Sequence, residues 1–351
     1  MKPIVLTYYL PQFHEVEENN KWWGEGFTEW TNINDAVTYF PNQKIRKPIE
    51  PLGQYNLLNN NVIEEQFKIA KDYGIDGFLI WNYWFGNNDK ILEKPLELII
   101  EKKLNVKYAV AWANHSWLNK AKGILLKEQL YIGEEDYIEY FEYLKKHFLS
   151  ENYIKIDGKP VFTIFRPQDI PDLDVFMSVF NRLSISIGFN GIYWLAENTT
   201  INNSYVQKFE SYFNSSSFLK NRRVNKINFV LEKINNFTKG KINFGPFVYD
   251  YSVLSQMENN KKYSLNEIPI IFTGWDTSVR HKRNGIVLKN LSINAFDSHV
   301  YNVTKYALES KVPVIIIKSW NEWAEGNVLE PDNIFGYKIL ETVKKYLKVE
   351  E

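Results

Sequence analysis

The chain alternates between short, almost continuously apolar runs and longer segments in which apolar residues recur at helical spacing. Eight of the apolar runs are bounded by Gly, Pro or polar residues and have the length of buried strands. Strands that are apolar on both faces are typical of a parallel sheet covered by helices on one side and by packed core on the other. The predicted strands are Ile4–Tyr9, Gly77–Tyr83, Lys107–Trp112, Pro160–Phe165, Gly191–Ala196, Glu210–Phe213, Pro269–Thr273 and Pro313–Lys318.

The segments between these strands predict amphipathic helices. In the first of them Ile63, Phe67 and Ala70 fall on one helical face, and Gly74 follows as a residue that ends helices well. Strands and helices that alternate in this way indicate the α/β class. The predicted helices are Val62–Tyr73, Leu92–Lys103, Asp136–His147, Asp174–Ser186, Asn294–Glu309 and Gly336–Lys348.

Eight strands in this order favour a (β/α)8 TIM barrel with elaborated βα loops, since the usual barrel leaves about 100 residues of this chain for loops. We expect a single domain over residues 1–351. The alternative is an open doubly wound sheet. No Gly-x-Gly-x-x-Gly or Walker-type Gly-Lys-Ser/Thr loop follows any predicted strand, which disfavours it. The polar, Asn- and Lys-rich segment 215–243 is interpreted as a loop or excursion.

Composition narrows the possible partners. The 42 Lys and Arg balance the 42 Asp and Glu, so the chain as a whole has no electrostatic reason to bind nucleic acid or an anionic membrane. The absence of Cys excludes disulfides and a thiolate nucleophile, and fits a reducing compartment. No stretch has the apolar length of a membrane span. The apolar run near the N-terminus lacks a signal-peptide cleavage pattern, and we expect a cytoplasmic protein.

Aromatic, amide and charged residues gather after the predicted strands. In a barrel the C-terminal strand ends meet at one rim, which is where catalytic residues lie. Trp and Tyr pack on the apolar faces of sugar rings, while amides, carboxylates and Arg bind hydroxyl groups. The sequence therefore predicts an oligosaccharide or polysaccharide ligand, bound by Tyr8, Tyr9, Glu29, Trp30, Trp81, Tyr83, Trp84, Asn114, His115, Trp117, Arg166, Trp275, Asp276, Trp320 and Asn321.

Glu322 and Glu325 are the predicted catalytic pair. Three positions apart on a helical turn, they would lie on the same side, with Cβ atoms roughly 5 to 6 Å apart. That separation suits a retaining glycosidase better than an inverting one. Trp320 and Trp323 would lower the local dielectric, so that one carboxyl keeps its proton as an acid. Such pairs more often decorate solvated helices, but this one directly follows a buried strand.

Other motifs are weaker. Asp172-Leu173-Asp174 matches a pattern of metal-dependent glycosyltransferases, but it stands where helix caps are favoured. The five His residues show no ligand spacing. We therefore expect neither a metal nor a cofactor.

Several motifs together resemble the WbsX-like proteins, which are often labelled glycosyltransferases of polysaccharide loci and are related to glycoside hydrolase family 99. The resemblance extends from residue 1 to about residue 345. It rests on the segments Tyr8-Tyr9-Leu10-Pro11-Gln12-Phe13-His14, Trp22-Trp23-Gly24, Gly26-Phe27-Thr28-Glu29-Trp30-Thr31-Asn32, Tyr83-Trp84-Phe85, Gly274-Trp275-Asp276, Trp320-Asn321-Glu322-Trp323-Ala324-Glu325-Gly326 and Leu329-Glu330-Pro331-Asp332.

The resemblance implies a (β/α)8 endo-α-mannosidase-like enzyme that acts with retention and needs no metal or nucleotide. By this likeness Glu322 would deprotonate the substrate's own 2-hydroxyl to form a 1,2-anhydro sugar, and Glu325 would protonate the leaving oxygen. Two positions depart from the usual pattern, because WbsX-like sequences carry His where this chain has Asn82, and Asn-Glu-Asn-Trp where it has Asn114-His115-Ser116-Trp117. The lost carboxylate at His115 changes which hydroxyls the rim can bind.

Three hypotheses follow. The first is a retaining, metal-independent enzyme acting on an α-linked glycoside of bacterial surface polysaccharide metabolism. The second is a glycosyltransferase or transglycosylase of O-antigen or capsule biosynthesis that uses the same cleft. The third is a non-catalytic glycan-binding barrel. The sequence leaves the sugar, the linkage and the oligomeric state open.

Overall fold

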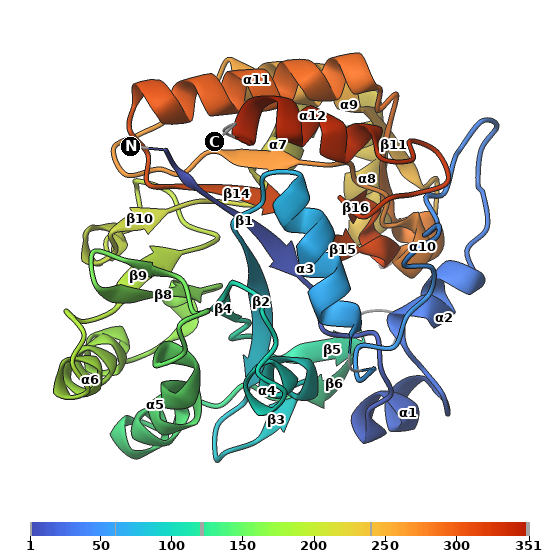
Figure 1. Ribbon diagram of the computed structural model, residues 1–351. Helices are drawn as coiled ribbons and strands as arrows, with labels where there is room; N and C mark the ends of the chain where they lie inside the picture. Colours follow the sequence, from blue (N-terminus) through green and yellow to red (C-terminus); the bar gives the residue numbers. More distant parts are fainter. Residues whose placement is uncertain (1, 60, 120–122, 239–240, 349–351) are drawn as a thin grey trace.

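The computed structural model describes residues 2–59, 61–119, 123–238 and 241–348. Its central sheet is made of eight parallel strands arranged as a barrel, with helices on the outside (Figure 1). All eight predicted strands are present, with ends within about two residues of the predicted ones. The barrel strands are β1 (Ile4–Tyr9), β2 (Gly77–Trp84), β4 (Tyr108–Trp112), β8 (Lys159–Ile164), β9 (Tyr193–Ala196), β10 (Ser211–Tyr212), β12 (Ile270–Phe272) and β14 (Val314–Lys318).

The spatial order of the strands is β10-β9-β8-β4-β2-β1-β14-β12. A parallel bridge between Tyr212 and Glu267 joins the two ends of this order. There the N–H of Tyr212 donates to the carbonyl of Asn266 (3.1 Å), and the N–H of Ile268 donates to the carbonyl of Tyr212 (2.8 Å). The sheet is thus a (β/α)8 barrel, and the C-terminal ends of its strands meet at one rim.

Amphipathic helices cover the barrel because their apolar faces pack on the outward-facing strand residues. In α3 (Val62–Asp72) the buried residues include Ile63, Phe67 and Ala70, as the spacing predicts. The other five predicted helices are also present: α4 (Lys94–Glu101), α5 (Glu134–Phe148), α6 (Leu173–Ser186), α11 (Ile293–Glu309) and α12 (Lys338–Leu347).

The loops between strands and helices hold further short elements. The helical ones are α1 (Glu17–Trp23), α2 (Glu29–Asn34), α9 (Tyr251–Asn259) and α10 (Ser278–His281), with 3-10 turns η1 (Pro167–Asp169), η2 (Val206–Lys208), η4 (Lys282–Asn284) and η5 (Trp323–Glu325). The short strands are β3 (Lys90–Ile91), β5 (Trp117–Asn119), β6 (Ile124–Lys127), β7 (Lys155–Ile156), β11 (Phe247–Asp250), β13 (Ile286–Lys289), β15 (Asn321–Glu322) and β16 (Asn327–Val328).

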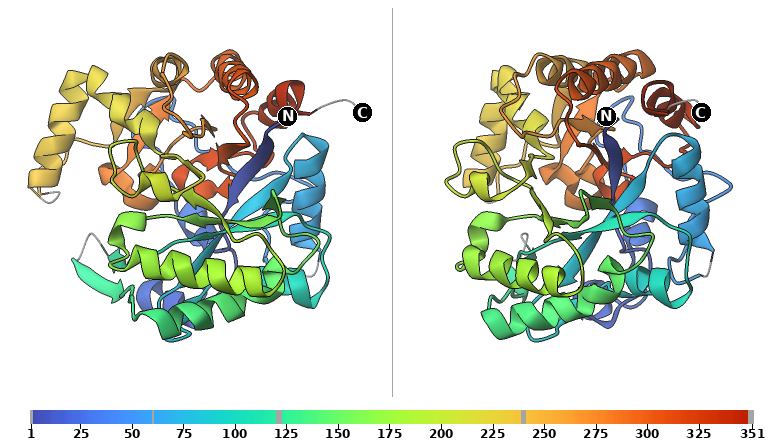
Figure 2. Two further views of the ribbon diagram at one scale, coloured as in Figure 1. Left: turned by 90° about the vertical axis from the view of Figure 1, so that its left-hand side faces the viewer. Right: turned by 60° about the vertical axis from the view of Figure 1, so that its left-hand side comes forward.

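The part 215–238 of the segment 215–243 holds helices and is not a simple loop. It contains α7 (Ser217–Lys220), η3 (Asn221–Val224) and α8 (Lys226–Phe237). The interpretation as a loop was therefore wrong for α8. Its high Asn and Lys content disguised a helix, most of whose apolar residues do not face the core. Figure 2 shows α8 at the outer edge of the molecule, away from the barrel.

Candidate active site

Lys318, the last residue of β14, carries the central positive charge of the site. Its side chain is 9% exposed, and its Nζ lies 3.5 Å from Oε1 of Glu322. The same ammonium group lies 5.5 to 5.9 Å from the ring centroids of Tyr8, Trp81 and Trp275. Burial alone would lower the pKa of Lys318, but the surrounding carboxylates, Glu322 first among them, outweigh burial and raise it. Lys318 is therefore a fixed cation walled by aromatic rings.

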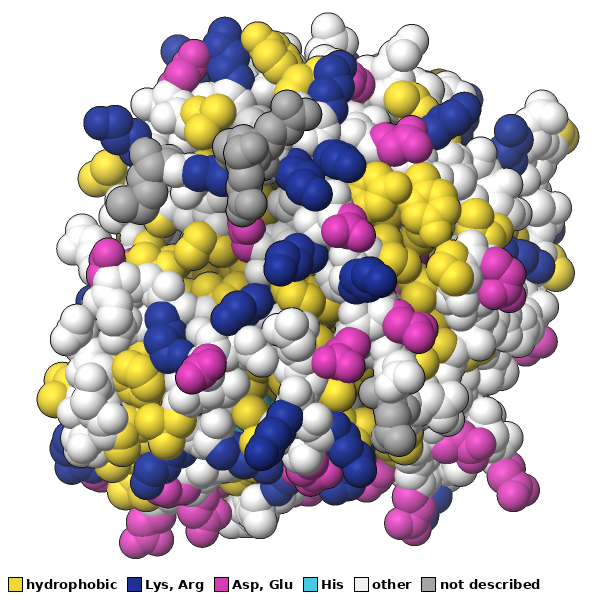
Figure 3. Space-filling view, viewed as in Figure 1, with side chains coloured by type: hydrophobic (Ala, Val, Ile, Leu, Met, Phe, Trp, Pro, Cys, Tyr) yellow, Lys and Arg dark blue, Asp and Glu magenta, His cyan; other side chains and the backbone are white. Residues whose placement is uncertain are grey.

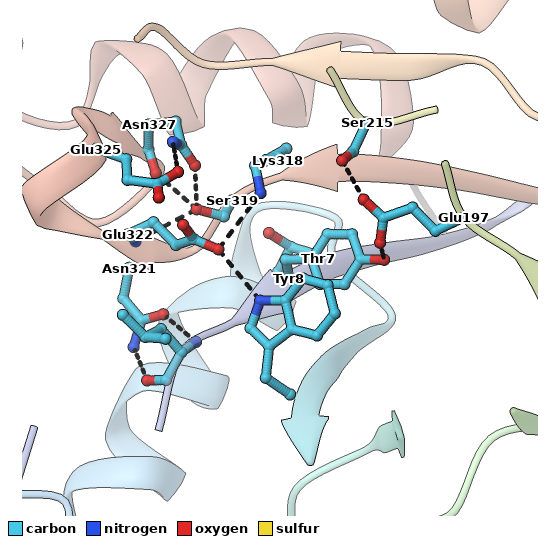
Figure 4. Close-up of polar contacts among 12 residues, drawn as sticks. Thr7, Tyr8, Glu197, Ser215, Lys318, Ser319, Asn321, Glu322, Glu325 and Asn327 are labelled. Carbon is cyan, nitrogen blue, oxygen red and sulfur yellow. Dashed lines mark hydrogen bonds and ion pairs between the residues drawn. The ribbon is translucent and has the colours of Figure 1, made fainter. Parts of the chain in front are cut away.

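Glu322 follows Lys318 by four residues and is 5% exposed. Its Oε1 accepts a hydrogen bond from Nε1 of Trp81 at 3.2 Å, and its backbone N–H donates to Oγ of Ser319 at 3.3 Å. Figure 4 shows its carboxyl group turned toward Lys318. Burial raises the pKa of Glu322 to about 7, the charge of Glu325 raises it further, and Lys318 opposes both. Glu322 is thus poised to hold a proton near neutrality.

Glu325 ends the 3-10 turn η5, which Glu322 directly precedes. Its Oε1 lies 2.9 Å from NH1 of Arg280. Burial would raise the pKa of Glu325, but Arg280 and then Lys318 outweigh it and hold it at about 2. The two glutamate carboxyls also hydrogen-bond each other, which raises the pKa of Glu322 and lowers that of Glu325.

Gly326 lets this turn pack against the loop after β12. Its φ is +64°, and a Cβ there would come within 2.7 Å of the backbone nitrogen of Asp276. That nitrogen donates to the carbonyl of Glu325 at 2.6 Å. The loop that carries Asp276 is thereby tied to the turn that carries Glu325.

Arg280 joins the pair to a third carboxylate. Its NH2 lies 2.5 Å from Oε1 of Glu29, whose side chain is 1% exposed, at the start of α2. Burial would lower the pKa of Arg280, but Glu29 and Glu325 outweigh burial and raise it. The guanidinium is 31% exposed and Glu325 is 17% exposed, so solvent reaches the cluster on this side.

Tyr8 and Glu197 form a second polar group on the other side of Lys318 (Figure 4). The hydroxyls of Tyr8 and Ser215 both donate to the carboxylate of Glu197, which is fully buried. Burial raises the pKa of Glu197, and Lys318 opposes that shift. The ring of Tyr8 stacks on Trp81 with centroids 4.3 Å apart. The stacked rings of Tyr8 and Trp81 thus lie between the Glu322–Glu325 pair and Glu197.

Part of the predicted binding set surrounds this cluster. Tyr8, Glu29 and Trp81 contact it as described above. Tyr83 is buried next to it: burial raises the pKa of its hydroxyl, and the charge of Glu322 raises it further. Trp275 contacts Lys318, while the side chain of Asp276 accepts hydrogen bonds from Gln43 and Ser278.

Five predicted residues point elsewhere, two of them, Tyr9 and Trp84, because side chains alternate along a barrel strand. Tyr9 donates to Gln66 of α3, and Nε1 of Trp84 donates to Asp136 of α5, so both lie on the helix side of the barrel. Trp30 packs on Phe13, Tyr55 and Trp323, Trp320 is fully buried beside Phe78, and the amide of Asn321 pairs with the backbone of Leu10. These side chains support the rim and do not face the cluster.

The remaining predicted residues lie around the rim. The amide of Asn114 bridges the backbone N–H and carbonyl of Arg166, whose guanidinium pairs with Asp169. His115 packs against Phe165, and the ring of Phe165 meets the face of Trp81 edge-on. Trp117 is half-buried and contacts Tyr83 and Trp22.

Lys318, Arg280 and Glu197 were not among the predicted site residues. A Lys at the end of an otherwise apolar strand was the available signal for Lys318, and the position after β9 was the signal for Glu197. No local sequence feature distinguishes Arg280 as a site residue, because Arg283 and two Lys residues lie close to it in sequence and carry the same charge.

Across residues 2–59, 61–119, 123–238 and 241–348, no group of three or more His, Cys, Asp or Glu is arranged to hold a metal ion. The carboxylates of the cluster are instead neutralised by Lys318 and Arg280. Within the described part of the chain, no helix is long and apolar enough to cross a membrane.

Glu330 supports the turn η5 through a hydrogen bond from Trp323. It is 1% exposed and accepts hydrogen bonds from Tyr55 (2.9 Å), Gln66 (2.7 Å) and Nε1 of Trp323 (2.6 Å). Burial raises the pKa of Glu330 to about 7, while its three donors oppose that shift. A raised carboxyl pKa favours the folded state at low pH, and this stabilisation is lost as pH rises through about 7.

We expect Glu330→Gln to destabilise the protein by about 1 to 3 kcal/mol near pH 5, because Gln offers one acceptor oxygen to three donors. The loss should shrink near pH 8, where wild type bears the cost of ionising Glu330 and the variant does not. Urea denaturation at both pH values measures it. An equal loss at both would show that Glu330 does not titrate in this range.

The comparisons with known proteins agree with this fold. The structure superimposes on the family 99 endo-α-mannosidase of Bacteroides thetaiotaomicron with a TM-score of 0.55 at 14% identity, covering 98% of this chain and 96% of that one. A structure described as a glycoside hydrolase-like protein gives a TM-score of 0.58 at 16% identity, covering 99% and 95%. At these identities the likeness establishes a shared fold, the (β/α)8 barrel.

The family model of the WbsX glycosyltransferases matches residues 5–343. The chain therefore belongs to the WbsX family, a family of glycosyl-processing proteins. The uncharacterized protein WxcX of Xanthomonas campestris pv. campestris (strain B100) is 26% identical over 98% of this chain. The chain spans about half the length (49%) of that relative.

Proposed function

We propose that the protein is a retaining enzyme that cleaves or transfers an α-linked glycoside, with Glu322 and Glu325 as its catalytic pair. One observation carries the proposal: a buried carboxyl, Glu322, and a partly buried one, Glu325, lie side by side at the rim of a (β/α)8 barrel, and their pKa values are driven apart to about 7 and about 2. Pairs of carboxyls with separated pKa values are the usual machinery of glycoside hydrolysis.

The chemistry needs one proton donor and one base. As the donor protonates the leaving oxygen, the anomeric C–O bond breaks. The base removes the proton of the substrate's 2-hydroxyl, whose oxygen attacks the anomeric carbon and gives a 1,2-anhydro sugar. Water or an acceptor hydroxyl then opens that ring, passing its proton to the former donor, and the 2-oxygen regains its own proton. Two inversions at the anomeric carbon give net retention. A glycosyl-enzyme intermediate would give the same outcome.

The charges of the substrate-free protein favour Glu322 as the donor and Glu325 as the base. Arg280 lies against Glu325 and keeps it ionised, whereas Glu322 shares the proton of the pair. The family resemblance implies the opposite roles. Because the carboxyls hydrogen-bond each other, transfer of one proton between them exchanges the roles of donor and base. Kinetic measurements therefore assign the two roles.

The substrate is proposed to be a bacterial surface polysaccharide or an intermediate of it. The half-buried Trp117 and Trp275 offer apolar surfaces for sugar rings, and Trp81, which Tyr8 supports from inside the barrel by stacking, lies between them and the carboxyl pair. An α-mannoside is the first candidate because the structural neighbour from Bacteroides thetaiotaomicron is an endo-α-mannosidase.

The family description favours a second candidate, transfer of a sugar to an acceptor. The chain lacks a phosphate-cradling Gly-rich loop after its barrel strands, which disfavours a nucleotide donor but not a lipid-linked one. Calorimetric titration with sugar nucleotides separates the two candidates, since tight binding would support the transferase.

The proposal is tested by incubating the protein with α-linked oligosaccharides and activated α-glycosides and following the anomeric signals by NMR. We expect a first-formed product of α configuration. The double variant Glu322→Gln/Glu325→Gln should be inert, while the exposed Glu142→Gln should match wild type. A first product of β configuration would rule out the mechanism. If wild type and the double variant bind glycans equally and neither turns them over, the protein is a glycan-binding barrel.

A further inference from the structure

Helix α8 is oriented opposite to an ordinary surface helix, with its polar residues against the protein. Its buried residues are Glu232 and Asn235. Glu232 makes a two-pronged ion pair with Arg222 (2.8 and 2.9 Å) and accepts from the hydroxyl of Tyr249 (2.9 Å). Asn235 donates to Asn284 at 3.1 Å, and Asn228 donates to the carbonyl of Val248. Polar contacts therefore fix α8 to the body of the protein.

Four of the six apolar residues of α8 face outward, whereas Phe229 and Leu231 are half-buried and Leu231 packs against the core. Ile227, Val230, Ile234 and Phe237 are 75%, 53%, 38% and 89% exposed. At about 100° per residue these four side chains fall within an arc of about 80°, so they form one continuous stripe along the helix. We call these four residues the α8 stripe. A surface helix of a globular protein normally buries such a stripe.

Positive charge borders the stripe. Lys226 and Lys233 are exposed and project along one edge of it, within roughly 40° of its nearest member by the same helical spacing. Arg223 and Lys241 are also exposed nearby. Residues 215–243 contain seven Lys or Arg and one acidic residue, Glu232, in a chain whose net charge is zero. By contrast, Figure 3 shows basic and acidic side chains interspersed on the face viewed in Figure 1.

A hollow extends the apolar surface toward α9. It has a volume of about 530 Å³ and lies between the start of α8 and the start of α9. Ile227, Val253 and Leu254 supply apolar walls and Lys226 lies at its edge. The one acidic lining residue, Asp250, is engaged by Ser252 and Asn290. Figure 2 shows α8 at the periphery of the molecule, and the start of α8 borders the hollow.

We propose that α8 and its flanking cations dock the protein on an anionic lipid bilayer, with the α8 stripe in the interfacial region and the lysines at the headgroups. An exposed apolar stripe bordered by Lys is the pattern of helices that lie in a membrane interface. Negative lipid headgroups complement the local excess of positive charge, although the average charge of the chain does not require them. This inference is independent of the catalytic proposal.

The test is flotation of the full chain with phosphatidylcholine–phosphatidylglycerol vesicles and with pure phosphatidylcholine vesicles. We expect binding to the anionic vesicles that weakens as salt is raised. Ile227→Ser/Phe237→Ser and Lys226→Glu/Lys233→Glu should each lower the bound fraction about tenfold or more, the first by removing the apolar anchor and the second by reversing the charge. The control Ile185→Ser/Leu265→Ser, which changes residues 59% and 82% exposed elsewhere, should bind like wild type.

All of the variants change exposed side chains and should keep the melting temperature of wild type. Absence of binding to anionic vesicles would overturn the proposal, as would equal binding of wild type and both α8 variants. A dimer in light scattering that Ile227→Ser/Phe237→Ser dissociates, without vesicle binding, would make a second copy the occupant. Turnover of a soluble substrate should be unchanged in the α8 variants, so failure of either proposal can be told from failure of the other.

Discussion

Glu322→Gln is expected to lower turnover by about a thousandfold, the typical contribution of a positioned acid or base. Gln keeps the shape of the side chain and its contact with Nε1 of Trp81, but it cannot supply a proton. The protein should remain folded, because the variant removes a buried ionisable group whose charged form burial disfavours. Turnover of an α-glycoside and a denaturation curve measure the two effects separately.

The pH profile identifies the role of Glu322. Because the pKa of Glu322 is about 7, a donor at this position is protonated below pH 7 and lost above it. We therefore expect the turnover of wild type to fall as pH rises through about 7. A rate that instead rises toward that pH would make Glu322 the base, as the family resemblance implies. Glu325, with a pKa of about 2, stays ionised throughout this range.

A leaving group that needs no proton provides a second criterion. Glycosyl fluorides and nitrophenyl glycosides should recover much of the lost rate in the variant that lacks the acid, but not in the one that lacks the base. We expect this recovery in Glu322→Gln. Recovery in Glu325→Gln would exchange the roles and leave the pair itself intact.

The barrel was predictable from sequence because its signal is local and repeated. Each strand is a short apolar run that ends in Gly, Pro or polar residues, and the eight runs agree with one another. The positions after the strands then indicated where the site lies. Thus Trp81, Tyr83 and Glu322 could be placed near one another although up to 241 residues separate them.

Side-chain direction was harder to predict. Tyr8 and Tyr9 are adjacent, aromatic and fully buried, yet one hydroxyl reaches Glu197 inside the barrel and the other reaches Gln66 of α3. Residue type does not distinguish Tyr8 from Tyr9. The register of the strand decides which side chain points into the barrel and which points toward the helices. Arg280 has no local signal at all, because its partner Glu29 is 251 residues away.

The net charge of the chain also concealed an uneven distribution of charged residues. A net charge of zero suggested no attraction to an anionic membrane, yet residues 215–243 hold a local excess of positive charge. Balanced totals are compatible with a separated arrangement, because screening confines each charge to about 8 to 10 Å of its surroundings. Only the position of α8 at the periphery shows that these basic residues belong to one surface of the protein.

Arg280→Met is expected to destabilise the protein by on the order of 3 kcal/mol, because it leaves the buried carboxylate of Glu29 without its partner. The matched control is Arg182→Met, which removes an ion pair to Glu134 whose side chains are 59% and 52% exposed. That variant should change stability by less than about 1 kcal/mol. Chemical denaturation near neutral pH compares the two. If both variants lost the same small amount of stability, the ion pairs of Arg280 would not contribute to the stability of the fold.

Arg280→Met should also change how the stability of the protein falls at acidic pH. The folded-state pKa of Glu325 is depressed to about 2, so its ion pair stabilises the fold above the ordinary carboxyl pKa and that contribution disappears as pH falls toward 2. Without Arg280 the pKa of Glu325 rises, and the loss of stability on acidification becomes shallower. Arg280→Lys keeps the charge but not the forked geometry that reaches Glu29 and Glu325 together. It should therefore restore more of the stability than of the turnover, since turnover requires Glu325 to stay ionised at a fixed position beside Glu322.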